Sequence, residues 1–290
     1  MSNVQAIARA IDFVEANLKE PITVSDMANA ASFSLYHFCR TFNAIAHHTP
    51  YDYLMRRRLA ESAWELRRTD KKIIDIACDF QFNNPETFAR AFRRVFDLQP
   101  NQLRKQAGVD RRRVMPRLTR AHLEQIAKGA YLKPALEEQP AFQIAGLMML
   151  VKSDRAVIAE LWELLARELE TCVRPDFYAI TYYPADWEDR GVLYLAGARI
   201  QTPDISSPAL VVKTIPASRY ARFIHKGSTQ ELPLTLDYIY HTWLPKSGAR
   251  VSYARLIEHL GSDLENAERA ESEREIYVPL EDSQERVSGA

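Results

Sequence analysis

The chain of 290 residues has few cysteines and no long apolar stretch. Its three cysteines, Cys39, Cys78 and Cys172, are odd in number and widely spaced, so the sequence predicts neither a disulfide framework nor a zinc site. No stretch approaches the ~18 uninterrupted apolar residues of a membrane span. The first residues lack the basic segment and the apolar run of a secretory signal. We therefore expect a cytoplasmic protein that does not engage a membrane.

The sequence also lacks the patterns that mark most catalytic or metal-binding chains. Its seven histidines show no metal-ligand spacing, and no phosphate-binding loop or activated nucleophile stands out. We therefore expect no cofactor and no enzymatic activity. The composition, 47% hydrophobic and 26% charged, is ordinary for folded protein, and the length allows about two domains.

The net charge of zero hides a difference between two parts of the chain. Residues 1–120 hold 20 Lys+Arg against 13 Asp+Glu, whereas residues 121–290 hold 18 against 25. The resulting charge of +7 on the first part indicates contact with a polyanion. The alternative is chance clustering on a solvated surface, so the charge needs support from a second feature.

A repeated phrase in the first part supplies that support. SLYHFCRTF at 34–42 returns as NPETFARAF at 84–92, with F-x-R-x-F in both, and the preceding segments 24–33 and 73–82 also match. Each copy predicts a short helix, a tight turn and a second helix. Because two copies of this layout lie on a basic part of the chain, a pair of DNA-binding helix-turn-helix units is favoured over plain helical hairpins.

The two second helices each have a predicted cap, a buried face and an exposed face. Ser34 caps one, and Asn83 or Asn84 caps the other, with Glu86 placed for a capping box. Helical spacing predicts burial of Leu35, Phe38, Phe42 and Ile45, and of Phe88, Phe92 and Val95 or Phe96. The exposed faces hold Tyr36, Cys39, Arg40 and Asn43, and Glu86, Arg90, Arg93 and Arg94.

The segment 51–70 between the copies predicts a rigid helical spacer. Its apolar stripe comprises Tyr51, Leu54, Met55, Leu59, Ala63 and Leu66. Such a spacer lets one chain reach two major-groove faces about 34 Å apart. Arg56, Arg57 and Arg58 cannot all face one way, so some of them are expected to form salt bridges or contact phosphate.

Residues 4–107 resemble the DNA-binding module of the AraC/XylS family of bacterial transcription regulators. The resemblance lies in VSDMANAASFSLYHFCRTF, PYDYLMRRRLAESAWEL and IIDIACDFQFNNPETFARAFRRVFDLQPNQLRK. It implies base contacts from Tyr36, Cys39, Arg40, Glu86 and Arg90. Phosphate candidates are Arg56, Arg93, Arg94 and Arg104.

Two departures from the family pattern affect the second helix and the turns. Ser32 and Gln81 stand where family members have glycine, so we expect slightly altered turns within the same fold. Pro85 and Ala89 offer no hydrogen-bonding side chain. We therefore expect the first helix to read bases and the second mainly to position the protein on phosphates.

Residues 108–130 have the composition of a basic linker. They carry Arg111–Arg113, Arg117 and Arg120 and no evident apolar face at their start. A tether that touches flanking phosphates and a merely solvated linker both fit this pattern.

From residue 131 the pattern changes to strands and helices, again duplicated. Each half reads as a strand, a Trp-bearing helix, a strand, an acidic loop and a strand. The predicted fold is therefore two domains. The first is all-α with two helix-turn-helix units, and the second is α+β with an antiparallel sheet, helices on one face and a concave surface.

Residues 131–282 resemble the GyrI-like effector-binding domain, through ASRYARFIHKG, YHTWLPKSG, ARLIEHL and EIYVPL. The resemblance implies a small effector, and an aromatic cleft with one carboxylate suits a flat lipophilic or cationic one. The expected effector residues are Glu258, Glu275, Tyr194, Trp243, Tyr182 and Tyr220; ordinary core is the alternative for each aromatic. Residues 283–290 are expected to form a tail.

The leading interpretation is a DNA-binding transcription regulator that responds to a small molecule and contacts RNA polymerase. Two alternatives stay open. The second domain could recruit a protein partner, or Glu258 with Glu275 could activate water in a hydrolase.

Overall fold

The computed structural model describes residues 2–106, 108–129, 133–152, 155–169, 176–184, 191–201, 207–252, 255–262 and 272–281. The chain divides into two compact units. The first comprises Met1–Gly129 with Pro233–Ser247, and the second Ala130–Leu232 with Gly248–Ala290. Within the described residues, none of the helices combines the length and the apolar character needed to cross a membrane.

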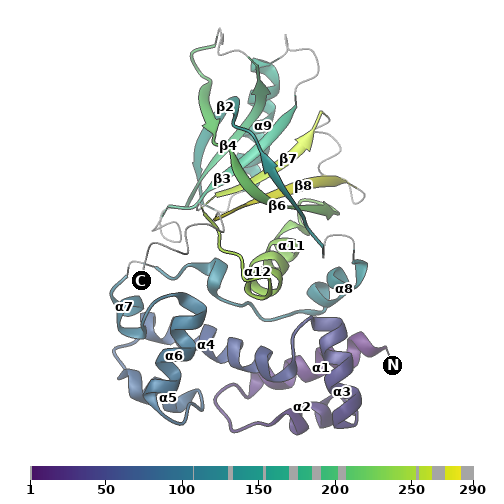
Figure 1. Cartoon of the computed structure of the whole chain (residues 1–290), viewed down its shortest axis with the longest axis vertical. Helices are drawn as coiled ribbons and strands as arrows, with labels where there is room; N and C mark the ends of the chain where they lie inside the picture. Colours follow the sequence, from purple (N-terminus) through teal and green to yellow (C-terminus); the bar gives the residue numbers. More distant parts are fainter. Residues whose placement is uncertain are drawn as a thin grey trace. The chain divides into compact units, whose positions relative to one another are not determined.

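The first unit is helical (Figure 1). Its elements are α1 (Asn3–Ala16), α2 (Val24–Ala30), α3 (Leu35–Ala46), α4 (Pro50–Arg68), α5 (Ile73–Asp79), α6 (Pro85–Phe96), α7 (Pro100–Lys105), η1 (Arg111–Arg113) and α8 (Arg120–Lys128). A later segment adds α11 (Leu232–Tyr238), η2 (Ile239–Trp243) and α12 (Leu244–Ser247). The pairs α2–α3 and α5–α6 are the two predicted helix-turn-helix units.

Each helix-turn-helix unit has its own apolar core. Phe38 and Phe42 of α3 lie in one cluster with residues of α1 and α2, whereas Phe88 and Phe92 of α6 lie in another with residues of α4 and α5. Ring centroids are 5.5 Å apart in the first pair and 5.4 Å in the second. The repeated phrase therefore encodes the same buried contact twice, as the spacing predicted.

The two turns keep the left-handed backbone that glycine would favour. Ser32 has φ 60° and Gln81 has φ 63°. The following amides repeat one hydrogen bond, from Phe33 N to Ala28 O at 3.0 Å and from Phe82 N to Ala77 O at 2.9 Å. Both residues thus adopt the left-handed conformation and keep the same hydrogen bond, while the expected alteration relative to family members stays a prediction.

Three details of the predicted helices are wrong: the capping-box position of Glu86 and the burial of Leu35 and of Tyr51. Asn84, one of the two predicted caps, caps α6, its Oδ1 accepting from the amide of Thr87 at 2.7 Å. Glu86 therefore lies one residue short of the capping-box position. Leu35 and Tyr51 are 49% and 61% exposed. Each lies in the first turn of its helix, α3 or α4, outside the buried stripe.

The spacer helix α4 is fixed by buried arginines. Arg57 and Arg58 are each only 5% exposed. Arg57 binds the carboxylate of Glu15, and Arg58 donates to the carbonyl oxygens of Leu18 and Glu20 at 2.9 and 2.6 Å. These bonds join α4 to the end of α1 and to the segment that follows it, so two of the three adjacent arginines hold the spacer in place.

The predicted linker is instead a folded part of the first unit. Val109 and Val114 join the core of the second helix-turn-helix unit, and Met115 and Leu118 join that of the first. Thr119 caps α8. The irregular spacing of these apolar residues gave no helical or strand period, which is why the sequence suggested a solvated segment.

The segment 233–247, expected in the effector domain, also belongs to the first unit. Thr242 Oγ1 lies 3.0 Å from His48 Nε2, and Asp237 Oδ2 lies 3.0 Å from His122 Nε2. Lys246 donates to the carbonyl oxygen of His47. The segment follows β6 in sequence yet packs among the helices of the DNA-binding part.

The second unit is built on one antiparallel sheet of eight strands, ordered β1-β6-β8-β7-β3-β4-β2-β5 (Figure 1). The strands are β1 (Ala135–Gln139), β2 (Phe142–Val151), β3 (Phe177–Tyr182), β4 (Val192–Ile200), β5 (Val211–Ile215), β6 (Ser218–Lys226), β7 (Arg255–Gly261) and β8 (Glu273–Leu280). The helix α9 (Arg155–Glu168) packs on β2 and β4.

The duplicated pattern is confirmed, with two edge strands that the sequence did not predict. The pair β3–β7 joins the halves at the centre of the sheet. The added strand β1 pairs with β6 of the other half, and β5 pairs with β2. Each half of the domain thus supplies the edge strand, β1 or β5, that pairs with a strand of the other half. The acidic loops and the predicted tail at 283–290 lie largely or wholly outside the described residues.

Candidate DNA-binding and small-molecule sites

The exposed face of α3 presents a tyrosine and an arginine side by side. Tyr36 is 73% exposed, and its hydroxyl accepts from Arg40 Nη1 at 3.2 Å. The guanidinium also lies 5.6 Å from the centre of the Tyr36 ring. Cys39 was expected on the same exposed face, but it is half-buried against the core of the first helix-turn-helix unit. The face offers both donors and an aromatic surface to a base edge.

The exposed face of α6 is mainly basic. Glu86, Arg90, Arg93 and Arg94 are exposed, and Pro85 and Ala89 are half-buried. Asn84 orders the start of the helix. Three outward guanidinium groups on one helix suit contact with phosphates, which Arg binds through paired N–H donors.

Two of the arginines predicted to contact phosphate, Arg56 and Arg104, form hydrogen bonds within the protein. Arg56 Nε donates to Asp52 Oδ2 at 2.9 Å, and Arg104 donates to the carbonyl oxygens of Leu66 and Lys71 at 3.3 and 2.5 Å. Burial alone would raise the pKa of Asp52, but the bonds from His48 and Arg56 lower it to about 2. The exposed Arg93 and Arg94 are therefore better placed for phosphate than Arg56 and Arg104.

Three arginines of residues 108–129 form short ion pairs with acidic side chains. Arg112 binds Asp110 at 2.9 Å, Arg117 binds Asp12 at 2.6 Å, and Arg120 binds Glu124 at 2.6 Å. This pairing counts against a phosphate tether, and the burial of Val109, Val114, Met115 and Leu118 counts against a merely solvated linker.

The predicted carboxylate Glu258 is buried on the α9 face of the sheet. It is 6% exposed, and its Oε2 accepts from Arg274 Nη1 at 3.2 Å. Burial raises the pKa of Glu258, and the Arg274 guanidinium opposes that rise. Tyr194 shares this face, and its hydroxyl accepts from Trp162 Nε1 at 3.2 Å. Burial and the nearby Glu258 raise the pKa of Tyr194.

Glu275 points to the opposite face of the sheet. Directly paired residues of antiparallel strands share a face, and His259 pairs with Glu275 whereas Glu258 pairs with Ile276. Glu275 accepts from His259 Nδ1 at 2.9 Å, from the hydroxyl of Tyr277 at 2.8 Å and from Arg222 at 2.7 Å. The two glutamates therefore cannot activate one water together, and the paired-glutamate hydrolase hypothesis is wrong.

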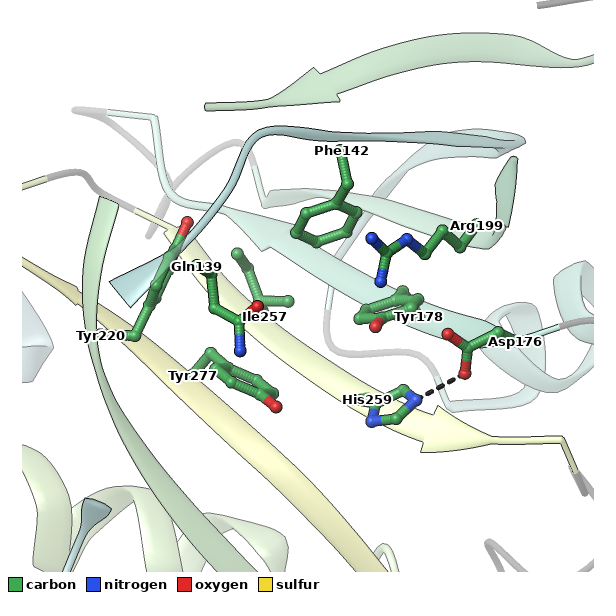
Figure 2. A pocket seen from close by; sticks show the side chains of 9 residues that line it. All are labelled: Gln139, Phe142, Asp176, Tyr178, Arg199, Tyr220, Ile257, His259 and Tyr277. Atoms are coloured by element: carbon green, nitrogen blue, oxygen red, sulfur yellow. Dashed lines mark hydrogen bonds and ion pairs between the residues drawn. The ribbon is translucent and has the colours of Figure 1, made fainter. Parts of the chain in front are cut away.

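The remaining predicted effector residues do not form one site. Tyr220 lines a cavity of about 220 Å³ on the face of Glu275. Tyr182 is half-buried beside the apolar cluster of that face, and Trp243 lies in η2 of the first unit. Most of the cavity wall was not predicted from the sequence; it is formed by Gln139, Phe142, Asp176, Tyr178, Arg199, Ile257, His259 and Tyr277 (Figure 2). The alternation of side chains between the two sheet faces along β3 and β7 was the sequence signal that could have grouped Tyr178, Ile257 and His259 on one face.

Comparison with known proteins agrees with both halves of this picture. Residues 27–106 match a helix-turn-helix domain, and residues 132–281 match the GyrI-like small-molecule-binding domain. The chain belongs to the GyrI-like family, with an AraC-type DNA-binding domain ahead of it.

Curated relatives of the AraC-type domain include transcription regulators. The regulatory protein SoxS of Salmonella typhimurium is 35% identical over 104 residues, which are 36% of this chain and 97% of SoxS. The right origin-binding protein, Rob, of Escherichia coli is 32% identical over 105 residues, 36% of each chain. This protein is thus an AraC-family DNA-binding regulator homologous to SoxS and Rob.

The GyrI-like domain resembles solved structures at lower identity. The crystal structure of the EcmrR C-terminal domain is 20% identical with a TM-score of 0.42, covering 51% of this chain and 97% of that one. In the present GyrI-like domain, Glu258 and Tyr194 lie together on the α9 face, and the cavity lined by Tyr220 lies on the other.

Proposed function

We propose that the protein is a cytoplasmic, sequence-specific transcription regulator that one small lipophilic effector, neutral or cationic, controls through the GyrI-like domain. The observation that carries the DNA-binding part is the duplication. Both helix-turn-helix units bury the same Phe pair and turn an arginine-bearing face to solvent. One chain can therefore place α3 and α6 in successive major-groove faces of a single site.

The two helices are assigned different tasks. Tyr36 and Arg40 of α3 read bases, because their side chains present hydrogen-bonding groups at the exposed centre of the helix. The α6 face lacks such groups at Pro85 and Ala89, so its arginines chiefly hold the protein on the phosphate backbone. Glu86 and Arg90 supply any base contact there.

The effector is proposed to bind beside Glu258 and Tyr194. Glu258 is already compensated by Arg274 at 3.2 Å, so a cationic effector must take the place of that guanidinium. The Trp162 and Tyr194 rings supply aromatic surface on the same face. A cationic effector that replaces the Arg274 guanidinium keeps the buried Glu258 carboxylate paired with a positive charge. A neutral effector keeps it paired by leaving Arg274 in place.

The segment 233–247 supports a physical link between effector and DNA. It lies between β6 and β7 in the sequence of the GyrI-like domain, yet it bonds to His48 and His122 among the DNA-binding helices. A shift in its position on effector binding would act on the end of α3 and the start of α4. The changed DNA-binding part would then alter contact with RNA polymerase, its proposed partner.

Thermal unfolding of the full-length protein tests the effector site. Lipophilic cations such as tetraphenylphosphonium are compared with neutral aromatics, on wild type and on Glu258→Gln. A bound compound at 100 times its dissociation constant stabilises the folded protein by about 2.7 kcal/mol. We expect stabilisation by cations in wild type and its loss in Glu258→Gln.

Two other outcomes would count against this assignment. Equal stabilisation of wild type and Glu258→Gln by cations would show that the cation does not bind at Glu258. No shift with any compound would favour a domain that recruits a protein partner, while leaving the DNA-binding assignment intact.

A further inference from the structure

The cavity on the face opposite Glu258 has the form of a small aromatic site. Its volume is about 220 Å³, below the ~300–1,000 Å³ typical of drug-sized ligands. Four rings and Ile257 line it, the rings belonging to Phe142, Tyr178, Tyr220 and Tyr277 (Figure 2). A flat molecule of one or two rings fits such a wall by stacking and edge contacts.

Two carboxylates, that of the wall residue Asp176 and that of Glu275 just outside the wall, are hydrogen-bonded to the wall residue His259. His259 bridges them, with Nε2 2.6 Å from Asp176 Oδ1 and Nδ1 2.9 Å from Glu275 Oε2. Burial lowers the pKa of His259, but the bonds to Glu275 and Asp176 outweigh burial and raise it. The imidazole also stacks on Tyr178, with ring centres 4.6 Å apart. Glu275 is therefore engaged, as is one oxygen of Asp176, whose side chain is 42% exposed.

Arg199 is the wall residue that presents a guanidinium to a ligand. Its guanidinium lies 5.1 Å from the centre of the Phe142 ring and within reach of the Tyr178 hydroxyl (Figure 2). Among the described residues, no carboxylate forms an ion pair with it within 4.0 Å. Since a guanidinium carries five N–H donors in a planar fork, several stay available for an incoming acceptor.

Arg199 also lies where the cavity opens. An adjoining hollow of about 750 Å³ shares Phe142, Asp176 and Arg199 with the cavity. A ligand can therefore lodge its ring among the aromatic side chains while an anionic group stays beside the guanidinium at the opening. A carboxylate matches the guanidinium fork best, because two parallel hydrogen bonds form.

We propose that this cavity is a binding site for small aromatic carboxylates, held by Arg199 at the charged end and by the aromatic wall at the ring. The site is separate from the Glu258 site, because Ile257 and His259 of β7 face the cavity while Glu258 faces the other side of the sheet. The same domain thus has two faces with opposite charge preferences.

Isothermal titration calorimetry of the full-length protein with 2-naphthoate and benzoate tests this proposal. Arg199→Gln should weaken binding at least ten-fold, because one good charge-assisted contact is lost. Wild type should bind the uncharged 2-naphthamide at least ten-fold more weakly than 2-naphthoate. The exposed Lys213→Gln removes the same charge from β5 outside the cavity and should leave binding unchanged.

Three results would overturn the proposal. They are no binding of either acid at millimolar concentration, equal affinity of wild type and Arg199→Gln, or equal affinity of the acid and its amide. Glu258→Gln distinguishes this site from the proposed effector site. It should abolish stabilisation by cations and leave 2-naphthoate binding intact, whereas a loss of 2-naphthoate binding would place the acid on the wrong face.

Discussion

An Arg40→Ala protein should bind its preferred DNA site more than ten-fold more weakly than wild type. Arg40 lies on the exposed face of α3 with Tyr36, and a good bidentate base contact contributes about 1–3 kcal/mol of discrimination. Fluorescence anisotropy at one fixed salt concentration measures the change, on a site selected by wild type from random DNA. The loss should be largest on that site and small on unrelated DNA.

Arg93→Ala is the matched control for this prediction. It removes an exposed arginine from α6 and should weaken binding similarly on all sequences, with a salt dependence lower by about one phosphate contact. If Arg40→Ala bound the selected site with an unchanged isotherm, Arg40 would not be a base-contacting residue.

Arg57→Ala should lower the free energy of unfolding by about 3–5 kcal/mol, because it leaves a buried charge without its partner. Arg57 binds both oxygens of Glu15 at 2.8 Å and donates to the carbonyl oxygen of Met115 at 2.7 Å. The Arg57 side chain is 6% exposed and that of Glu15 is 10% exposed. The variant would keep only the Tyr53 hydroxyl on Glu15, at 2.7 Å.

Urea unfolding measures this loss, with Arg117→Ala as the control. Arg117 and Asp12 also form a short ion pair, but their side chains are 53% and 62% exposed. Such an exposed pair contributes about 0–1 kcal/mol. Equal effects of the two substitutions would show that the buried network does not hold α4 against α1.

The helical part of the protein was largely predictable because its signals are local. The spacing of Phe38 and Phe42, repeated at Phe88 and Phe92, reports one buried helix face without any knowledge of the rest. The residues at 108–119 lack such a period, and only their tertiary neighbours bury the apolar ones among them. The same holds for segment 233–247, whose place depends on His48 and His122, far away in sequence.

The small-molecule sites were less predictable because they depend on strand register. Glu258 and Glu275 both lie in strands recognised from the sequence, but the pairing of β7 with β8 sets them on opposite faces. The cavity wall likewise draws Tyr178, His259 and Tyr277 from three different strands. Composition indicated an aromatic site, whereas only the register showed which rings share a face.

Hydroxyl-radical footprinting of the full-length protein on its selected site tests whether one chain uses both recognition helices. We expect two protected stretches on one side of the duplex, about one helical turn or 10 base pairs apart, at one chain per site. A single protected stretch, or two stretches that appear only with two chains bound, would contradict the use of both recognition helices by one chain.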